Sequence, residues 1–147
     1  SLGGVAGHAG LFSTAKDLGV FSQMMLNRGL YGWKRIFKPE TVDLFTKRAN
    51  VLEGSSRCLG WDSPSGKASG GVYLSASSFG HTGFTGTSLW IDPENAVIVI
   101  LLTNAVHPNR KSKDPVYYNW RQRIHSSVYE ILGIVEKNPS LKWRKSW

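Results

Sequence analysis

The chain has 147 residues, and its 41% of hydrophobic residues suffice for one packed domain and exclude global disorder. The single cysteine, Cys58, excludes an internal disulfide framework, and cysteines and histidines show no metal-ligand spacing, so we expect no metal or other cofactor. The net charge is +8, but no apolar run is long enough to span a membrane and no nucleic-acid-binding module accompanies the basic residues, so we expect neither partner.

A first helix is predicted after a Gly- and Ala-rich loop at residues 3–10. Ser13 or Thr14 can cap this helix, and Thr14 to Asp17 fits a capping box in which Asp17 reaches back to the cap amide. Its apolar face is predicted to consist of Leu18, Phe21, Met24 and Met25. A second helix is predicted from Pro39, at its first position, to about Arg48. Its inward face is predicted to hold Val42, Leu44 and Phe45.

A loop-rich stretch, residues 50–76, follows the second helix. Leu59–Trp61 could form a brief strand, and Trp61 is expected to pack against the sheet or line a groove. The density of Gly and Ser at 63–71 indicates a surface loop that borders a pocket. Cys58 is expected to be a partly buried structural thiol.

The segment 78–104 is predicted to be the centre of the fold. His81–Gly83 reads as a short strand, and it is followed by a hairpin whose returning arm, Ala96–Leu102, is apolar at every position. Such a strand must be covered on both faces, so helices or another layer should lie above and below it. Asp92 favours entry into the turn at 93–95, and Asn95 tolerates a positive φ there.

The longest helix is predicted from Pro115 to about Leu132, before Gly133, and it should lie across the sheet. Its buried face is predicted to consist of Tyr117, Trp120, Ile124, Val128 and Ile131. The histidines outside the segment 78–104 are expected to be structural or exposed; these are His8, His107 and His125.

One nucleophile pattern of serine enzymes occurs literally at the first helix. Ser13–Lys16 matches the Ser-x-x-Lys of class A β-lactamases and penicillin-binding proteins. Such a site also needs a Tyr-x-Asn or Ser-x-Asn before its Lys-Thr-Gly-type strand, whereas the Tyr-x-Asn here, Tyr117–Asn119, follows that strand. We therefore interpret Ser13 as a helix cap and Lys16 as a solvated side chain.

Three segments together resemble one enzyme family. They are GHAGLFSTAKDLGVFSQMML (7–26), KPETVDLFTKR (38–48) and SFGHTGFTGTSLWIDPENAVIVILLTN (78–104), followed by the terminal helix. They are similar to the C-terminal part of β-lactamase-related serine hydrolases, which include class C β-lactamases, DD-peptidases and esterases, and most similar to modules fused to family 3 glycoside hydrolases in Bacteroidetes. The resemblance covers residues 3 to about 133. It implies an α+β fold of the β-lactamase/transpeptidase type, an antiparallel sheet covered by helices, with residues 1–147 forming the C-terminal portion of one domain.

The resemblance also implies a site. In this family the Ser-x-x-Lys nucleophile and the Tyr-x-Asn both precede the segment seen here, and His81–Gly83 would be the third active-site element. His81 stands where lactamases usually have Lys, which suits a peptidase or esterase better than a lactamase. His81 and Thr82 would hydrogen-bond a substrate carboxylate or tune nearby protons, and Gly83 would keep the approach open. The backbone N–H of Phe84 would donate into an oxyanion hole.

We therefore expect the C-terminal part of a serine hydrolase that acts on a peptidoglycan peptide, β-lactam or ester through an acyl-enzyme and is inactive alone. One alternative is a non-catalytic module that binds peptidoglycan or peptide through the His81 strand. Another is a structural partner whose basic C-terminal tail docks on an anionic surface. The family implies a periplasmic or cell-envelope location. It also implies that the free edge of the Ala96–Asn104 strand pairs with the missing N-terminal part or with a second copy.

Overall fold

The computed structural model describes residues 3, 10–66, 68–109 and 115–146. Its centre is an antiparallel sheet of three strands in the order β3–β4–β5, which are Phe79–Thr82, Ser88–Asp92 and Val97–Leu101. The helices are α1 (Ala15–Leu26), α2 (Pro39–Thr46), α3 (Pro115–Ile131) and α4 (Ile134–Lys137). A ribbon of β1 (Leu30–Tyr31) and β2 (Lys34–Arg35) links α1 to α2, and a 3-10 helix (Pro139–Trp143) follows α4.

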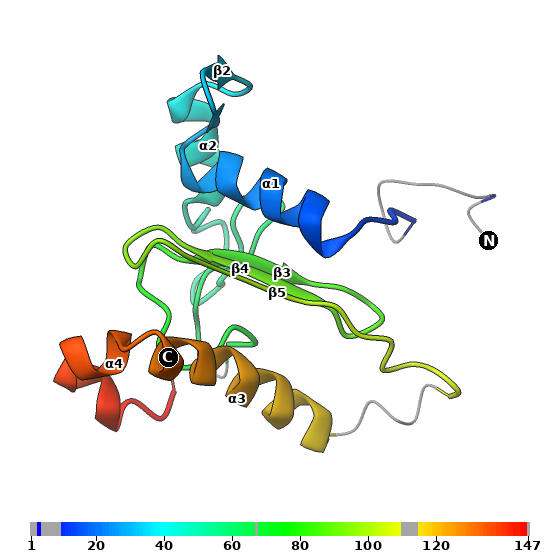
Figure 1. Cartoon of the computed structure of the whole chain (residues 1–147), viewed down its shortest axis with the longest axis vertical. Coiled ribbons are helices and arrows are strands. Elements are labelled where there is room, and N and C mark those ends of the chain that lie inside the picture. The colour runs from blue at the N-terminus through cyan, green and yellow to red at the C-terminus, as the bar shows by residue number, and fades with distance from the viewer. Residues whose placement is uncertain (1–2, 4–9, 67, 110–114, 147) are drawn as a thin grey trace.

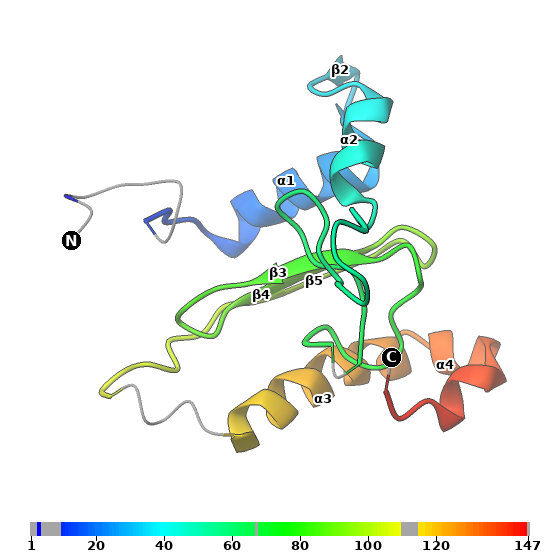
Figure 2. The ribbon, with the colours of Figure 1, turned by 180° about the vertical axis from the view of Figure 1, so that it is seen from behind.

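The helices lie in two layers, with α1 and α2 on one face of the sheet and α3 and α4 on the other (Figures 1 and 2). Successive strand residues point to opposite layers. Towards α1 and α2, the sheet contributes Phe79, Leu89, Ile91 and Ile98 to a cluster with Met24, Met25 and Val42. Towards α3 and α4, it contributes Trp90, Val97 and Val99 to a cluster with Tyr129 and Val135. The predicted α+β fold, with helices covering both faces of the apolar strand, is confirmed.

Helix α1 begins as its local chemistry predicts, with two corrections. Thr14 is the N-cap, because its hydroxyl oxygen accepts a 3.1 Å hydrogen bond from the Asp17 N–H. The Asp17 carboxylate accepts from the Thr14 hydroxyl at 2.9 Å instead of reaching back to a backbone amide. Ser13 is exposed and is not the cap.

Helix α2 starts at Pro39 as predicted and ends two residues early. Of its predicted inward face only Val42 is buried, while Leu44 and Phe45 are 62% and 45% exposed. Beyond α2, Leu59–Trp61 is not a strand but a tight turn closed by a 2.8 Å hydrogen bond from Cys58 N–H to Trp61 C=O. Cys58 is buried, as expected.

The loop 63–71, predicted to lie on the surface, is partly buried. Ser63, Pro64 and Ala68 are buried, and Arg48 holds the loop by hydrogen bonds to the Ser63 hydroxyl and the Pro64 carbonyl. In the β4–β5 turn the positive φ lies at Ala96 (52°) and not at the preceding asparagine.

Helix α3 runs close to its predicted bounds, but its buried face matches the prediction only in part: Tyr117, Ile124 and Val128 are partly buried, while other residues are the most buried. Arg121, His125 and Tyr129 are 6%, 0% and 1% exposed, whereas Trp120 and Ile131 are 49% and 83% exposed. The cause is hydrogen bonding, because His125 and Tyr129 turn inward to polar groups of strand β4. His107 is exposed as expected, whereas His8, much of the 3–10 loop and residues 110–114 lie outside the described residues.

Candidate functional site

His81 and Thr82 end strand β3, and Gly83 lies one residue beyond it. On the side of β3 away from β4, Gly80 exchanges two backbone hydrogen bonds with Asp62, of 2.7 and 2.9 Å. Backbone hydrogen bonds of an antiparallel strand alternate between its two sides. Thr82 follows Gly80 by two residues and therefore directs its N–H and C=O to the same side. We call this side, from Thr82 onward, the outer edge of β3.

The exposed imidazole of His81 lies between a cation and a carbonyl. Its Nε2 is 3.0 Å from the Arg57 guanidinium, and its Nδ1 is 2.8 Å from the Thr82 carbonyl oxygen. A neutral ring that donates from Nδ1 and accepts at Nε2 satisfies both contacts, since a guanidinium can only donate and a carbonyl can only accept. Arg57 also pairs with Asp62 at 3.1 Å, so the guanidinium is held beside His81 with its charge balanced in part by that carboxylate.

Arg57 is a site residue to which the sequence pattern does not point. It precedes His81 by 24 residues in a loop without periodicity, and the Asp62–Gly80 bridge brings that loop to the strand. The only signal is chemical, namely a basic residue in the loop-rich stretch 50–76, outside the segment 63–71 that was predicted to border a pocket.

A tight turn joins β3 to β4 directly after Thr82. The Gly83 N–H donates to Thr87 C=O at 2.9 Å, and the Gly86 N–H donates to Gly83 C=O at 3.0 Å. A Cβ at position 83 would meet the Thr87 hydroxyl, so a larger residue there would require the Thr87 side chain to shift. Phe84, the next residue, is 56% exposed.

The polar side chains of α3 support the opposite side of this turn. Tyr117 donates a 2.6 Å hydrogen bond to Gly86 C=O, and buried Arg121 lies within 3.4 Å of the same oxygen. His125 Nε2 is 2.8 Å from the Ser88 hydroxyl. Burial, followed by the charge of Arg121, lowers the pKa of His125 to about 4, so this ring is neutral at physiological pH. His125 is therefore structural, as expected.

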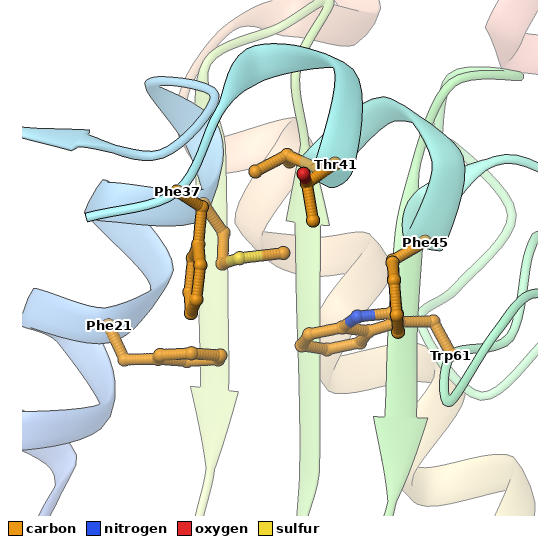
Figure 3. A pocket seen from close by; sticks show the side chains of 7 residues that line it. Phe21, Phe37, Thr41, Phe45 and Trp61 are labelled. Atoms are coloured by element: carbon orange, nitrogen blue, oxygen red, sulfur yellow. The ribbon is translucent and has the colours of Figure 1, made fainter. Parts of the chain in front are cut away.

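A separate apolar groove of about 220 Å³ lies between α1 and α2 (Figure 3). Phe21 and Trp61 stack with ring centroids 6.2 Å apart, and Trp61 meets Phe79 edge to face, so Trp61 both packs on the sheet and lines the groove. Thr41 is the one polar side chain in its described lining. The groove offers surface for apolar contact, whereas acid–base groups gather at the end of β3.

The literal Ser-x-x-Lys does not form part of this arrangement, because Ser13 and Lys16 are both exposed at the start of α1. Within the described ranges, no three His, Cys, Asp or Glu side chains gather in a way that could hold a metal ion. None of the helices described here is long and apolar enough to cross a membrane.

Comparison with known proteins identifies the family. The family model described as Beta-lactamase matches residues 2–122. Proteins named "Putative D-alanyl-D-alanine carboxypeptidase" from Salmonella paratyphi B and Salmonella newport are each 45% identical over 111 residues, and one from Salmonella gallinarum is 44% identical over 110. Each match covers 73% of this chain and 25% of the relative, so the chain spans about a quarter of these relatives' length. The chain therefore belongs to the β-lactamase family.

Proposed function

We propose that this chain is the C-terminal part of a catalytic domain whose substrate lies along the outer edge of β3. The supporting observation is the alternation at Gly80, which directs the Thr82 backbone groups away from β4. An extended acyl substrate can add to such an edge as a further strand. The Gly83 C=O accepts from the Gly86 N–H inside the turn, so we assign the Phe84 N–H, which belongs to the same trans peptide, to the opposite side, where it would donate into the oxyanion hole.

The proposed substrate is a peptide that ends in D-Ala-D-Ala, the class in the names of the Salmonella relatives. Its terminal carboxylate suits the Arg57 charge beside His81, while the Thr82 hydroxyl can donate to the same group. Esters and β-lactams react through the same acyl chemistry and are the alternative substrate classes. We place the reaction in the cell envelope, and specifically in the periplasm, where such peptides occur. A closer kinship with modules fused to family 3 glycoside hydrolases stays a prediction.

The proposed reaction needs groups from the rest of the protein. A serine of a Ser-x-x-Lys motif would attack the carbonyl of the penultimate residue, and a Tyr-x-Asn would shuttle its proton to the departing amine. The oxyanion would be stabilised by the Phe84 N–H and the nucleophile's own N–H until D-alanine leaves. Water would then hydrolyse the acyl-enzyme. The chain alone, with Ser13 exposed at a helix start, would be inactive.

The test uses the complete protein and an N-acylated peptide ending in D-Ala-D-Ala. D-Alanine should be released, and His81→Ala should lower kcat/KM by roughly tenfold or more, the usual range for a group that assists proton transfer or binding. The unfolding temperature should barely change, because His81 is exposed; His107→Ala, at another exposed histidine, is the matched control. Peptide binding without release would favour the non-catalytic module. Equal loss of turnover and stability in His81→Ala would make His81 structural.

A further inference from the structure

Side chains from the C-terminal half of the chain hold the β3–β4 turn. The Tyr117 hydroxyl, in the first turn of α3, donates to Gly86 C=O at 2.6 Å and lies 3.0 Å from the Thr103 hydroxyl. Thr103 in turn donates to Thr85 C=O at 3.1 Å, and the Ala105 N–H donates to that same carbonyl at 2.8 Å. Two consecutive carbonyls of the turn therefore have partners outside it.

Gly86 transmits this restraint to the side of the turn that faces the proposed substrate. Its N–H donates to Gly83 C=O at 3.0 Å. The Gly83 carbonyl and the Phe84 N–H belong to one planar trans peptide, in which they point in opposite directions. A rotation of this peptide that redirects the Phe84 N–H must therefore break the hydrogen bond from Gly86.

Tyr117 and Gly86 are also fitted to each other in shape. Gly86 has a φ of +95°, which favours glycine, and a Cβ there would lie 2.1 Å from the Tyr117 hydroxyl oxygen. The tyrosine ring is only half-buried and touches the rings of Tyr118 and Trp120, so its packing does not depend on the hydroxyl. A Tyr117→Phe substitution therefore removes the hydroxyl while keeping the packing of the ring.

We propose that Tyr117 is a positioning residue, whose hydroxyl orients the Phe84 N–H through Gly86 and Gly83 towards the oxyanion. The proposal rests on the proposed function, which assigns Phe84 as the oxyanion donor. Tyr117, the tyrosine of the Tyr-x-Asn in α3, would thus act on catalysis by positioning the backbone and would not carry a proton.

The test compares Tyr117→Phe with Tyr73→Phe in the complete protein. Tyr73 is the matched control, because its hydroxyl also bonds to α3, at Glu130 (3.2 Å), away from the turn. Loss of a whole oxyanion donor lowers kcat by about 10²–10³, so misorientation of one should lower it roughly tenfold, with KM within about twofold. Affinity for a peptide boronic acid, which forms a tetrahedral anionic adduct, should fall by the same factor as kcat. Tyr73→Phe should leave both values at the wild-type level.

A second measurement does not depend on activity. Hydrogen exchange of the Gly86 amide should become at least several-fold faster in Tyr117→Phe and stay unchanged in Tyr73→Phe. Unchanged exchange, or wild-type kcat and boronate affinity in a folded Tyr117→Phe protein, would overturn the positioning role. An inactive wild-type protein in which the exchange difference persists would instead remove the proposed function and leave the restraint in place.

Discussion

The hydroxyl of Tyr129 donates a 2.9 Å hydrogen bond to the carboxylate of Asp92, and the two residues are 1% and 0% exposed. The same carboxylate accepts hydrogen bonds from the backbone and hydroxyl of Ser75 and from the backbone and side chain of Asn95. One buried anion thus ties α3, the loop before β3 and the β4–β5 turn to strand β4.

Removing the Tyr129 hydroxyl should therefore weaken the fold. In Tyr129→Phe the buried carboxylate loses a donor that water cannot replace, which costs about 1–3 kcal/mol of unfolding free energy. Urea unfolding measures the change. Tyr73→Phe, in which the lost bond is exposed, should cost less than about 0.5 kcal/mol. Equal effects in the two variants would mean that the Asp92 network does not stabilise the packing of α3.

The pH dependence of stability should have two parts, and the first comes from His125. Its pKa is about 4 in the folded chain and about 6.5 in an unfolded one, so below pH 6.5 the unfolded chain binds the proton first. The stabilisation is complete above about pH 6.5 and is lost as the pH falls towards 4, by roughly 3 kcal/mol in total. His125→Gln, whose amide can still meet Ser88, should flatten the profile between pH 7 and 4.5. His107→Gln should leave it unchanged.

The second part comes from Asp92 at lower pH. Burial alone would raise the pKa of Asp92, but hydrogen bonds from Ser75, Asn95 and Tyr129 outweigh it and hold this pKa below its usual value. A carboxyl whose folded pKa is lowered stabilises the fold fully above its unfolded pKa, about 3.9, and loses that effect as the pH falls through the folded value. Unfolding should therefore steepen again below about pH 4. In Tyr129→Phe this loss of stability at low pH should begin at a higher pH. If it begins at the same pH as in the wild type, the loss does not come from Asp92.

The layers of the fold were predictable because their signals are local or periodic. Thr14 and Pro39 start helices through their own chemistry, and the uninterrupted apolar run of β5 requires a covered sheet whatever covers it. The buried face of α3 was not predictable from periodicity. Its central residues include Arg121 and His125, whose partners are 35 and 37 residues away in sequence. Polar residues of this kind look like a solvated face until their partners are known.

The candidate site also combines residues that a local sequence motif predicts with one that only the tertiary structure places there. Residues 81–84 are contiguous and were predicted from one motif, and the structure adds the ladder alternation that gives Thr82 its direction. Arg57 was not found, because its place beside His81 depends on the tertiary bridge between Asp62 and Gly80.

The isolated chain should not react with serine-directed probes. Ser13 is exposed next to the cap of α1, and among the described residues its hydroxyl makes a long 3.5 Å contact with the Thr14 carbonyl, which neither activates a nucleophile nor holds an acyl carbonyl. A fluorophosphonate and a fluorescent β-lactam should both leave the chain unlabelled by intact mass, as they should a Ser13→Ala variant. The complete protein, labelled at another serine, is the positive control. Stoichiometric labelling at Ser13 would overturn this interpretation.

Strand β5 should determine the association state of the isolated chain. Within the part of the chain that the structure describes, β5 pairs with β4 alone. The ladder alternation directs the backbone of Val99 to β4 and those of Ile98 and Ile100 to the free edge. Helices α1 and α3 cover the faces of the sheet but have no backbone groups to offer this edge.

We therefore expect the isolated chain to self-associate through β5 or to bind the N-terminal part of its own protein, since an apolar edge recruits another strand. Light scattering should report a dimer or larger species, and hydrogen exchange at Ile98 and Ile100 should slow as concentration rises while Val99 stays slow throughout. Ile100→Pro removes an edge donor without touching the pairing to β4 and should give a monomer, whereas Val99→Pro should disrupt the sheet itself. A wild-type monomer with slow exchange at both isoleucines would mean that the edge is covered within the chain, and the proposed pairing with an N-terminal strand would then be wrong.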